Sequence, residues 1–209
     1  MPQLKVVIFD CDGVMFNSRK ANEAYYNQIL KHFKRAMMNE DECHFVHMHT
    51  ADESVAYLFR DTPRLRDAAQ EYRKQIDYIP FIPYMEMASD LMPFLAYLRP
   101  TYHTAISTNR TDTMQYVLSM HGLEEYFDFV VSALDVQRPK PHPESLHKIL
   151  HYFKIKPAEA VYIGDSEVDQ AASEAAGVPL VAYKNRKLAA SYYIDNFQEL
   201  EKIIGGFRG

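Results

Sequence analysis

Short apolar runs alternate with helical patterns over most of the chain. Residues 6–9 are four consecutive apolar positions, too few for a buried helix, and they predict an interior strand of a parallel sheet. Four more strands are predicted at 101–107, 129–131, 160–163 and 179–182, and helices are predicted at 91–98, 113–121, 143–153, 166–176 and 197–204. This alternation indicates a Rossmann-like α/β fold, a five-stranded parallel sheet with helices on both faces.

The alternation is interrupted after the first strand. Helical spacing of apolar residues begins after Ser18, continues to Met37, and returns at 53–59 and 63–76, while 39–52 is polar and irregular. Residues 78–84, which contain two prolines, form a linker back to the sheet. The chain leaves the sheet at its carboxyl edge, forms this insertion and returns to the same edge. We therefore predict an α-helical cap domain at 15–83, which lies above an α/β core domain at 1–14 and 84–209.

Composition narrows the functional classes. A hydrophobic content of 47% and a net charge of −5 are ordinary for a globular protein, and they do not show the excess of basic residues that is typical of nucleic-acid-binding proteins. No apolar run is long enough for a membrane span or a signal peptide, so we expect a cytoplasmic protein without membrane or nucleic-acid partners. We expect it to be a monomer or weak homodimer. The two cysteines are expected to be free thiols, and Cys11 to be a packing residue, since flanking acids suppress its thiolate.

The first strand ends in two carboxylates and a glycine. Asp10 and Asp12 follow it directly, and Gly13 allows the chain to turn. Ligands of open α/β sheets bind beyond the carboxyl ends of the strands. Two acids at such a position repel each other unless a cation lies between them, and Mg²⁺ is the first hypothesis. The alternative is a capped strand end with two solvated carboxylates.

Further polar residues follow the other predicted strands. Thr108-Asn109 ends the second strand, Lys140 lies between two prolines, and Asp165 and Asp169 follow the fourth strand in the sequence Gly-Asp-Ser-Glu-Val-Asp. Each alone is commonly structural: a helix cap, a solvated loop charge or a turn. Together they supply a carboxylate nucleophile, a second acid, a hydroxyl, an ammonium and a further metal ligand, which phosphoryl transfer requires.

The order and spacing of these residues closely resemble the four motifs of the haloacid dehalogenase superfamily of phosphohydrolases. Asp10 and Asp12 match its DxD, Thr108 the second motif, Lys140 the third, and Asp165 with Asp169 the GDxxxD of the fourth. The helical insertion is similar to the small cap of the phosphoglycolate phosphatase and β-phosphoglucomutase branch. The resemblance implies a core strand order of 5-4-1-2-3.

The resemblance also implies a role for each matched residue. Asp10 would attack phosphorus and form an aspartyl-phosphate, while Asp12 would protonate the leaving group and then activate water. Mg²⁺ would be bound by the Asp10 side chain, the Asp12 main-chain carbonyl and Asp165, with Asp169 ordering the coordination shell. The phosphoryl oxygens would be bound by Thr108, Asn109 and Lys140. We therefore predict a Mg²⁺-dependent phosphatase for a small soluble phosphate monoester, phosphoglycolate-like or sugar-phosphate-like.

The cap departs from the family and carries the candidate specificity residues. Met15 and Asn17 replace the commoner Leu and Asp after the first motif, and the return linker at 84–87 lacks a frequent glycine. In the polar segment of the cap, His47 and His49, together with His44, are candidates for substrate contact, the alternative being surface histidines. The cap arginines Arg60, Arg64 and Arg66 are candidates for binding a second anionic group, although a solvated face is the preferred interpretation.

Three other functions use part of the same inventory. A phosphomutase of the β-phosphoglucomutase type would need the same groups but return the phosphoryl group to a rotated intermediate. A dehalogenase needs neither Asp12 nor a metal, and the presence of Asp12 and Asp165 disfavours it. A non-catalytic phosphate-responsive module, such as a response-regulator receiver, has its phosphorylated Asp after a later strand and carries no cap.

Overall fold

A computed structural model describes residues 3–205. Its largest element is a parallel sheet of six strands in the order β5-β4-β1-β6-β7-β8. β1 lies at the centre, paired with β4 on one side and β6 on the other. The strands are β1 (Val6–Phe9), β4 (His103–Ser107), β5 (Phe129–Val131), β6 (Ala160–Gly164), β7 (Leu180–Tyr183) and β8 (Tyr192–Ile194).

The prediction of five strands in the order 5-4-1-2-3 is therefore corrected to six strands in the order β5-β4-β1-β6-β7-β8. The apolar pattern does not reveal β8, because it has three residues and only its pairing with β7 defines it as a strand. A two-residue antiparallel pair, β2 (Phe16–Asn17) with β3 (Glu86–Met87), is also too short to be predicted. This pair joins the two chain segments that connect the sheet with the inserted helices.

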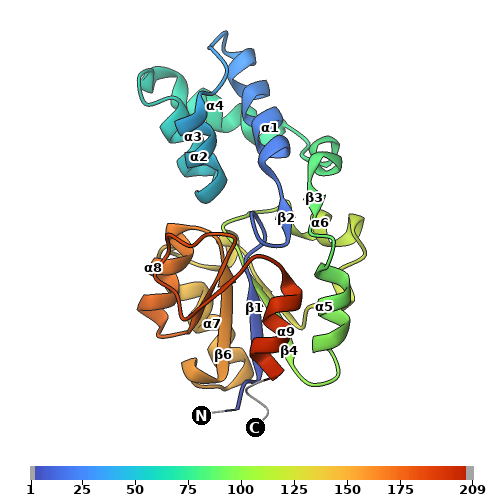
Figure 1. Ribbon diagram of the computed structural model, residues 1–209. Coiled ribbons are helices and arrows are strands. Elements are labelled where there is room, and N and C mark those ends of the chain that lie inside the picture. Colours follow the sequence, from blue (N-terminus) through green and yellow to red (C-terminus); the bar gives the residue numbers. More distant parts are fainter. Residues whose placement is uncertain (1–2, 206–209) are drawn as a thin grey trace.

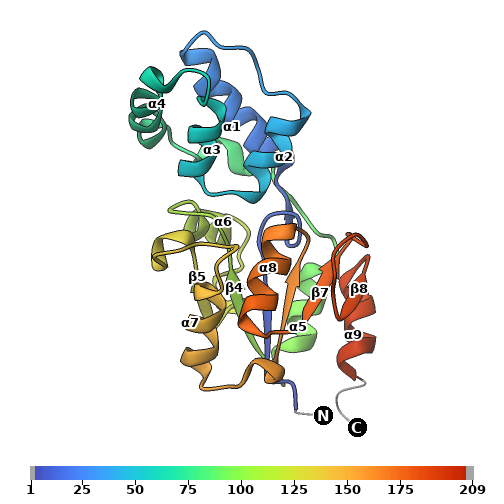
Figure 2. The same cartoon turned by 90° about the vertical axis from the view of Figure 1, so that its left-hand side faces the viewer.

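Helices cover both faces of the sheet, as predicted. α5 (Leu91–Leu98) and α9 (Phe197–Gly205) lie on one face, and α7 (Glu144–Phe153) and α8 (Glu167–Ala176) on the other (Figures 1 and 2). Because strand side chains alternate, β1 contributes to two apolar cores. Phe9 packs on Phe94 and Phe197 of the first pair, whereas Ile8 belongs to the core beneath the second pair. Burying each such side chain contributes about 1.5–3 kcal/mol to folding.

The insertion folds into four α-helices, which lie above the carboxyl ends of the strands (Figure 1). They are α1 (Arg19–His32), α2 (Glu40–Met48), α3 (Ala51–Leu58) and α4 (Pro63–Gln75), followed by the 3₁₀ helix η1 (Ile79–Tyr84). The expectation of an irregular segment at 39–52 is wrong, since α2 occupies most of it and α3 begins at Ala51. Asn39 and Glu42 form a capping box that starts α2 despite its polar composition.

The end of the first cap helix also differs from the prediction. α1 stops at His32, and Met37, expected on its apolar face, is exposed. Within 3–205, no helix is both long and apolar enough to cross a bilayer. The cap boundary at 15–83, the cytoplasmic location and the oligomeric state stay predictions. Residues 1–2 and 206–209, assigned to the core domain, lie outside the described residues.

Candidate active site

A cavity lies between the carboxyl edge of the sheet and the cap. We call it the central cavity. Its floor comes from loops that follow β1, β4 and β6 and from the loop containing Lys140. The predicted site residues that line it are Asp10, Asp12, His47, His49, Thr108, Asn109, Lys140 and Asp165. The structure thus brings together residues that are up to 155 positions apart in the chain.

Asp10 is fixed by two hydrogen bonds to the same oxygen. Its Oδ1 accepts from the Lys140 ammonium at 2.8 Å and from the Cys11 backbone N–H at 2.7 Å. Both Asp10 and Lys140 are almost fully buried. Because these bonds go to Oδ1, Oδ2 is the oxygen available to a ligand in the cavity.

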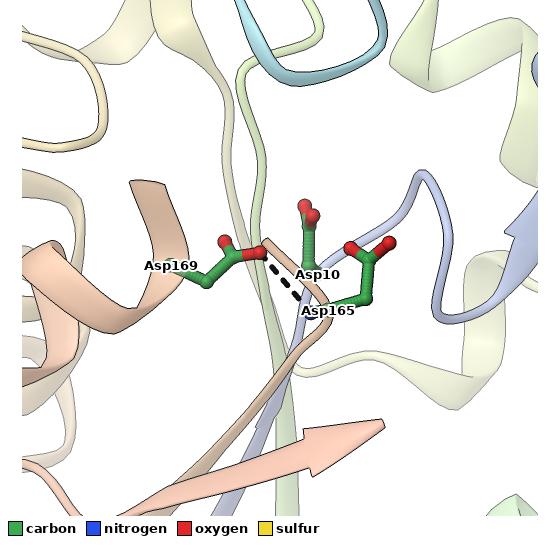
Figure 3. Close-up of side chains that lie close together, drawn as sticks. All are labelled: Asp10, Asp165 and Asp169. Atoms are coloured by element: carbon green, nitrogen blue, oxygen red, sulfur yellow. Dashed lines mark hydrogen bonds between the residues drawn. The ribbon is translucent and has the colours of Figure 1, made fainter. Parts of the chain in front are cut away.

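Three carboxylates meet beside Asp10. Asp10, Asp165 and Asp169 each offer an oxygen within 4.8 Å of the others, a spacing that one metal ion can bridge. Figure 3 shows their carboxyl groups gathered where β1 and β6 end. Two glycines make this proximity possible: a Cβ at Gly13 would lie 2.0 Å from Asp165 Oδ2, and a Cβ at Gly164 2.4 Å from the Asp169 Cβ.

Asp169 orders the other groups rather than facing the cavity. Its Oδ1 accepts from Lys140 Nζ at 2.7 Å and from the Tyr162 hydroxyl at 2.6 Å. Its Oδ2 accepts from the backbone N–H groups of Asp165 and Ser166 and from the Ser166 hydroxyl. The Asp165–Asp169 bond is drawn in Figure 3. Both oxygens of Asp169 are therefore engaged, which leaves Asp10 and Asp165 as the side chains best placed for a cation.

The electrostatics of this cluster show an excess of negative charge. Burial, together with the charge of Asp169, raises the pKa of Asp10 to about 7, although Lys140 opposes the shift. Burial and the charges of Asp169 and Asp10 raise the pKa of Asp165 well above its ordinary value. Burial would lower the pKa of Lys140, but Asp10 and Asp169 raise it above its usual range. A divalent cation would stabilise the charged forms of Asp10 and Asp165, the two carboxylates whose pKa is raised.

Asp12 pairs with Arg110, a residue that is not part of the four sequence motifs. Its Oδ1 accepts from Arg110 Nη2 at 2.7 Å and from the Ser18 hydroxyl. Burial would raise the pKa of Asp12, but the Arg110 guanidinium lowers it below its ordinary value. The two acids of the DxD motif therefore lie in unlike environments, Asp10 beside an ammonium and two carboxylates and Asp12 beside a guanidinium.

Arg110 also connects this acid with the cap linker. Its Nη2 lies 3.4 Å from the Tyr78 hydroxyl and 3.5 Å from Met85 Sδ, and its guanidinium lies 5.3 Å from the centre of the Tyr78 ring. Its backbone N–H donates to the Thr108 hydroxyl at 3.1 Å. The one sequence signal for Arg110 is its position directly after Thr108-Asn109. Its partner Asp12 is 98 residues away and becomes visible only in the fold.

Asn109 holds two loops and the cap together. Its side-chain amide donates to the Lys140 carbonyl at 2.9 Å and accepts from the Lys140 N–H at 3.0 Å. The same amide donates to the Met48 carbonyl at the end of α2, at 3.2 Å. Thr108 is buried at the end of β4. The second and third motifs are thus fixed to each other and contact the cap.

The cap histidines are divided by the fold. His47 and His49 line the central cavity, whereas His44 is not among its lining residues. His49 is held by its own helix, with Nδ1 2.9 Å from the Phe45 carbonyl and its ring stacked on Phe45. Burial lowers the pKa of His47, although Asp12 opposes the shift, so the ring is neutral near pH 7. The Arg60 side chain binds Glu42 and is largely solvated.

This arrangement suits attack on an electrophilic phosphorus. An accessible carboxylate oxygen, a neighbouring ammonium, a buried hydroxyl and a cluster of acids suited to a divalent cation meet in one partly enclosed cavity. A cation and an ammonium together would offset the repulsion between a carboxylate and a phosphate dianion.

Comparison with known proteins gives concordant results. The family model described as haloacid dehalogenase-like hydrolase matches residues 7–183. The pyrophosphatase PpaX of Bacillus pumilus is 30% identical over 179 residues, which cover 83% of this chain and 80% of that protein. A HAD-superfamily hydrolase, subfamily IA, variant 1, from Geobacter sulfurreducens is 39% identical, with a TM-score of 0.79 over 97% of both chains.

Two more distant solved structures share the fold. A predicted phosphoglycolate phosphatase from Haemophilus somnus is 21% identical, with a TM-score of 0.83 over 97% of this chain and 99% of that one. A β-phosphoglucomutase from Clostridium difficile is 17% identical, with a TM-score of 0.85 over 98% of this chain and 97% of that one. At these identities the likeness concerns the fold alone.

Proposed function

Because this chain belongs to the haloacid dehalogenase-like hydrolases, a family of enzymes, we propose that it is a Mg²⁺-dependent phosphatase that forms an aspartyl-phosphate on Asp10. Its substrate would be a small phosphate monoester, either phosphoglycolate-like or sugar-phosphate-like. A phosphoric anhydride such as pyrophosphate is also a candidate, because the Bacillus pumilus relative is named a pyrophosphatase. The observation that carries the proposal is the buried Asp10–Lys140 pair on the floor of the central cavity, beside Asp165 and Thr108.

The residues present fit a magnesium ion. Mg²⁺ takes one or two carboxylates, with waters and substrate phosphate completing its octahedron. The side chains of Asp10 and Asp165 and the main-chain carbonyl of Asp12 would bind it, and Asp169 would hold the Asp165 loop in place. When bound, the ion supplies positive charge that lets a carboxylate approach a phosphate dianion.

The protein groups then divide the chemistry between them. Asp10 Oδ2 would attack phosphorus, the bond from phosphorus to the leaving oxygen would break, and Asp12 would give that oxygen a proton. Because Arg110 lowers the pKa of Asp12, Asp12 would have to take up this proton as the substrate binds. In the second step Asp12 would accept a proton from water, which attacks the acyl-phosphate and releases inorganic phosphate. Lys140, the Thr108 hydroxyl and the Asn109 main chain would hold the phosphoryl oxygens, and Lys140 would balance their charge.

Arg110 would act as a positioning residue for Asp12. Its short ion pair fixes the direction of the Asp12 side chain, and its contacts with Tyr78 and Met85 link that side chain to the linker between cap and core. We propose that residues 15–83 form the cap and that this linker and the β2–β3 pair let it close over the substrate. Closure would exclude water from the cavity.

A phosphomutase would use the same groups and is the second candidate. It differs in outcome, because the phosphoryl group returns to a rotated intermediate instead of passing to water. A panel of phosphorylated small molecules, assayed for free phosphate and for isomerised product with and without Mg²⁺, separates the two. Free phosphate that depends on Mg²⁺ supports the phosphatase; isomerisation without free phosphate supports the mutase. Phosphate release that survives EDTA overturns the proposed mechanism.

Binding of Mg²⁺ is expected to raise the melting temperature by several degrees. A ligand at about 100 times its Kd adds roughly 2.7 kcal/mol, and a chain of this size shifts by about 2–4 °C per kcal/mol. Asp165→Asn should lose this shift, because it removes one of the two best-placed ligands. Scanning fluorimetry with EDTA and with Mg²⁺ measures it. Glu167→Gln, a change at an exposed acid two residues away, is the control and should keep the shift.

Substitution of Arg110 is expected to slow the chemical step. Arg110→Met should lower kcat about 10²-fold on an alkyl phosphate, because the acid that protonates a poor leaving group is no longer aligned. The loss on 4-nitrophenyl phosphate should be smaller, since its leaving group needs less protonation. Arg138→Met, at an exposed position in the next loop, is the control. Equal losses on both substrates would indicate a purely structural role for Arg110.

A further inference from the structure

The cap wall of the central cavity differs chemically from its floor. We use the name cap wall for the cap residues that line this cavity. Among them Arg73 is the formally charged side chain; the others are tyrosines, histidines, an asparagine and apolar residues. The floor, in contrast, carries the acids Asp10, Asp12, Asp112 and Asp165 together with the cations Arg110 and Lys140. A leaving group that extends from the reacting phosphorus toward the cap therefore meets a cation and neutral hydrogen-bonding groups.

Arg73 is held in place without being neutralised inside the cavity. Its Nη2 donates to Asp52 Oδ1 at 2.6 Å and its Nε to Gln70 Oε1 at 3.1 Å. The Arg73 side chain is 12% exposed, whereas that of Asp52 is 71% exposed. Because Asp52 is largely in water, its charge is screened more strongly than that of the mostly buried guanidinium. The guanidinium has further N–H donors besides those bonded to Asp52 and Gln70, and these remain for a ligand in the cavity.

The other cations of the cavity already have partners on the floor. Lys140 binds Asp10 and Asp169, and Arg110 binds Asp12. Two neutral groups of the cap wall lie ready to add hydrogen bonds. The Tyr25 hydroxyl interacts with Arg73, and His47 has a buried Nδ1 with no hydrogen-bond partner in the described part of the chain.

A second cavity adjoins the first, and the residues that line both are Tyr25, Arg73, Tyr78, Thr111, Asp112 and Thr113. Arg73 thus lies where the two cavities meet. The charged residues that line the second cavity include more acids than bases, namely Asp52, Asp77 and Asp112 with Arg73 and Lys74. An anion is therefore disfavoured in the second cavity beyond Arg73.

We propose that Arg73 forms a subsite for a second oxyanion, carried by the leaving group of the substrate. The subsite would bind a carboxylate or a phosphate through the guanidinium fork, with Tyr25 as neighbour. This inference rests on the proposed phosphatase function and narrows its substrates. The enzyme would favour phosphorylated small acids or inorganic pyrophosphate over neutral sugar phosphates.

Equilibrium binding tests the subsite independently of catalysis. Calorimetry in the presence of Mg²⁺ compares methylphosphonate with phosphonoacetate and methylenediphosphonate, which add a carboxylate and a second phosphonate. The wild type should bind one or both of the analogues that carry a second acidic group at least 10-fold more tightly than methylphosphonate, and the preferred analogue identifies the oxyanion. Arg73→Gln should abolish this preference. A wild type without the preference, or a variant that keeps it, overturns the proposal.

A matched pair of variants separates binding from structure. Asp52→Asn breaks the same ion pair but keeps the guanidinium, so it should retain the preference, and Arg64→Gln makes the same change at an exposed site of α4. If Asp52→Asn loses the preference as Arg73→Gln does, the ion pair is structural and the subsite is refuted. Melting temperatures confirm that each variant is folded.

Turnover distinguishes failure of the subsite from failure of the proposed function. Arg73→Gln should lower kcat/KM about 10–100-fold on phosphoglycolate or pyrophosphate, mainly through KM, and less than threefold on 4-nitrophenyl phosphate. Equal effects on all substrates refute the subsite while the phosphatase stands. If the wild type hydrolyses no phosphate compound, the proposed function fails, and the calorimetric preference still decides whether Arg73 binds an oxyanion.

Discussion

Asp10→Asn is expected to give a folded chain whose phosphate release falls by roughly 10⁴-fold or more. An amide of the same shape keeps the packing around β1 but cannot act as the nucleophile. Lys140 retains Asp169 as a partner, so the ammonium is not left unpaired. Steady-state release of phosphate with Mg²⁺ measures the effect. In the wild type, mass spectrometry of rapidly quenched reactions should find the phosphoryl group on the peptide that contains Asp10.

The control for this variant is Asp67→Asn, the same change at an exposed position of α4. It should leave both turnover and melting temperature unchanged. Asp10→Asn also weakens the magnesium site, so the loss must persist at Mg²⁺ concentrations that saturate the wild type. An Asp10→Asn enzyme that keeps a tenth of the wild-type rate, or a phosphoryl group trapped on another residue, would contradict the proposed nucleophile.

Much of the core could be predicted because each step depends on local pattern. Four consecutive apolar residues at 6–9 predict the central strand, and the strand lies at the centre with every residue buried. The family resemblance is confirmed by the family model that matches residues 7–183, a range that contains the four predicted motifs. Parallel strands place their carboxyl ends at one edge, and this geometry brings Asp10, Thr108 and Asp165 to one cavity.

The helices and strands that the sequence did not predict are those that do not show a periodic pattern of hydrophobic residues. α2 is polar, with one buried residue, Val46, but it has a capping signal in Asn39 and Glu42 that identifies its start. β8 has only three residues, and its backbone pairs with β7. Its formation depends on an open sheet edge, which is a property of the assembled fold and not of the segment.

The residues that line or support the cavity and were missed lie on elements that seem ordinary in sequence. Arg73 lies on a helix whose charged positions are typical of a solvated face, and only the position of α4 over the sheet turns it toward the cavity. Tyr162 occupies an interior strand position, where an aromatic residue usually means packing; its hydroxyl instead binds Lys140 and Asp169. Pairing partners far apart in sequence cannot be inferred from one sequence.

Removal of the Lys140 ammonium is expected to damage both stability and activity. Lys140 is 2% exposed and contacts Asp10, Asp169 and the Tyr162 hydroxyl. Lys140→Met leaves those carboxylates buried without their cation, and loss of one partner from a buried ion pair costs about 3–5 kcal/mol. Phosphate release should fall by about 10³-fold, because the charge that balances the phosphoryl oxygens is lost. Chemical denaturation in EDTA and steady-state assays measure the two effects.

The two effects of Lys140→Met should separate when Mg²⁺ is added. The cation compensates the same carboxylates, so it should restore part of the lost free energy of unfolding. It cannot replace an ammonium that contacts the phosphoryl group, so turnover should stay low. Asp169→Asn in the same chain should also recover stability, since it removes one unpaired charge. Lys148→Met, at an exposed position of α7, is the control. If Lys140→Met is as stable as the wild type in EDTA, the ammonium is not what holds this acidic cluster together.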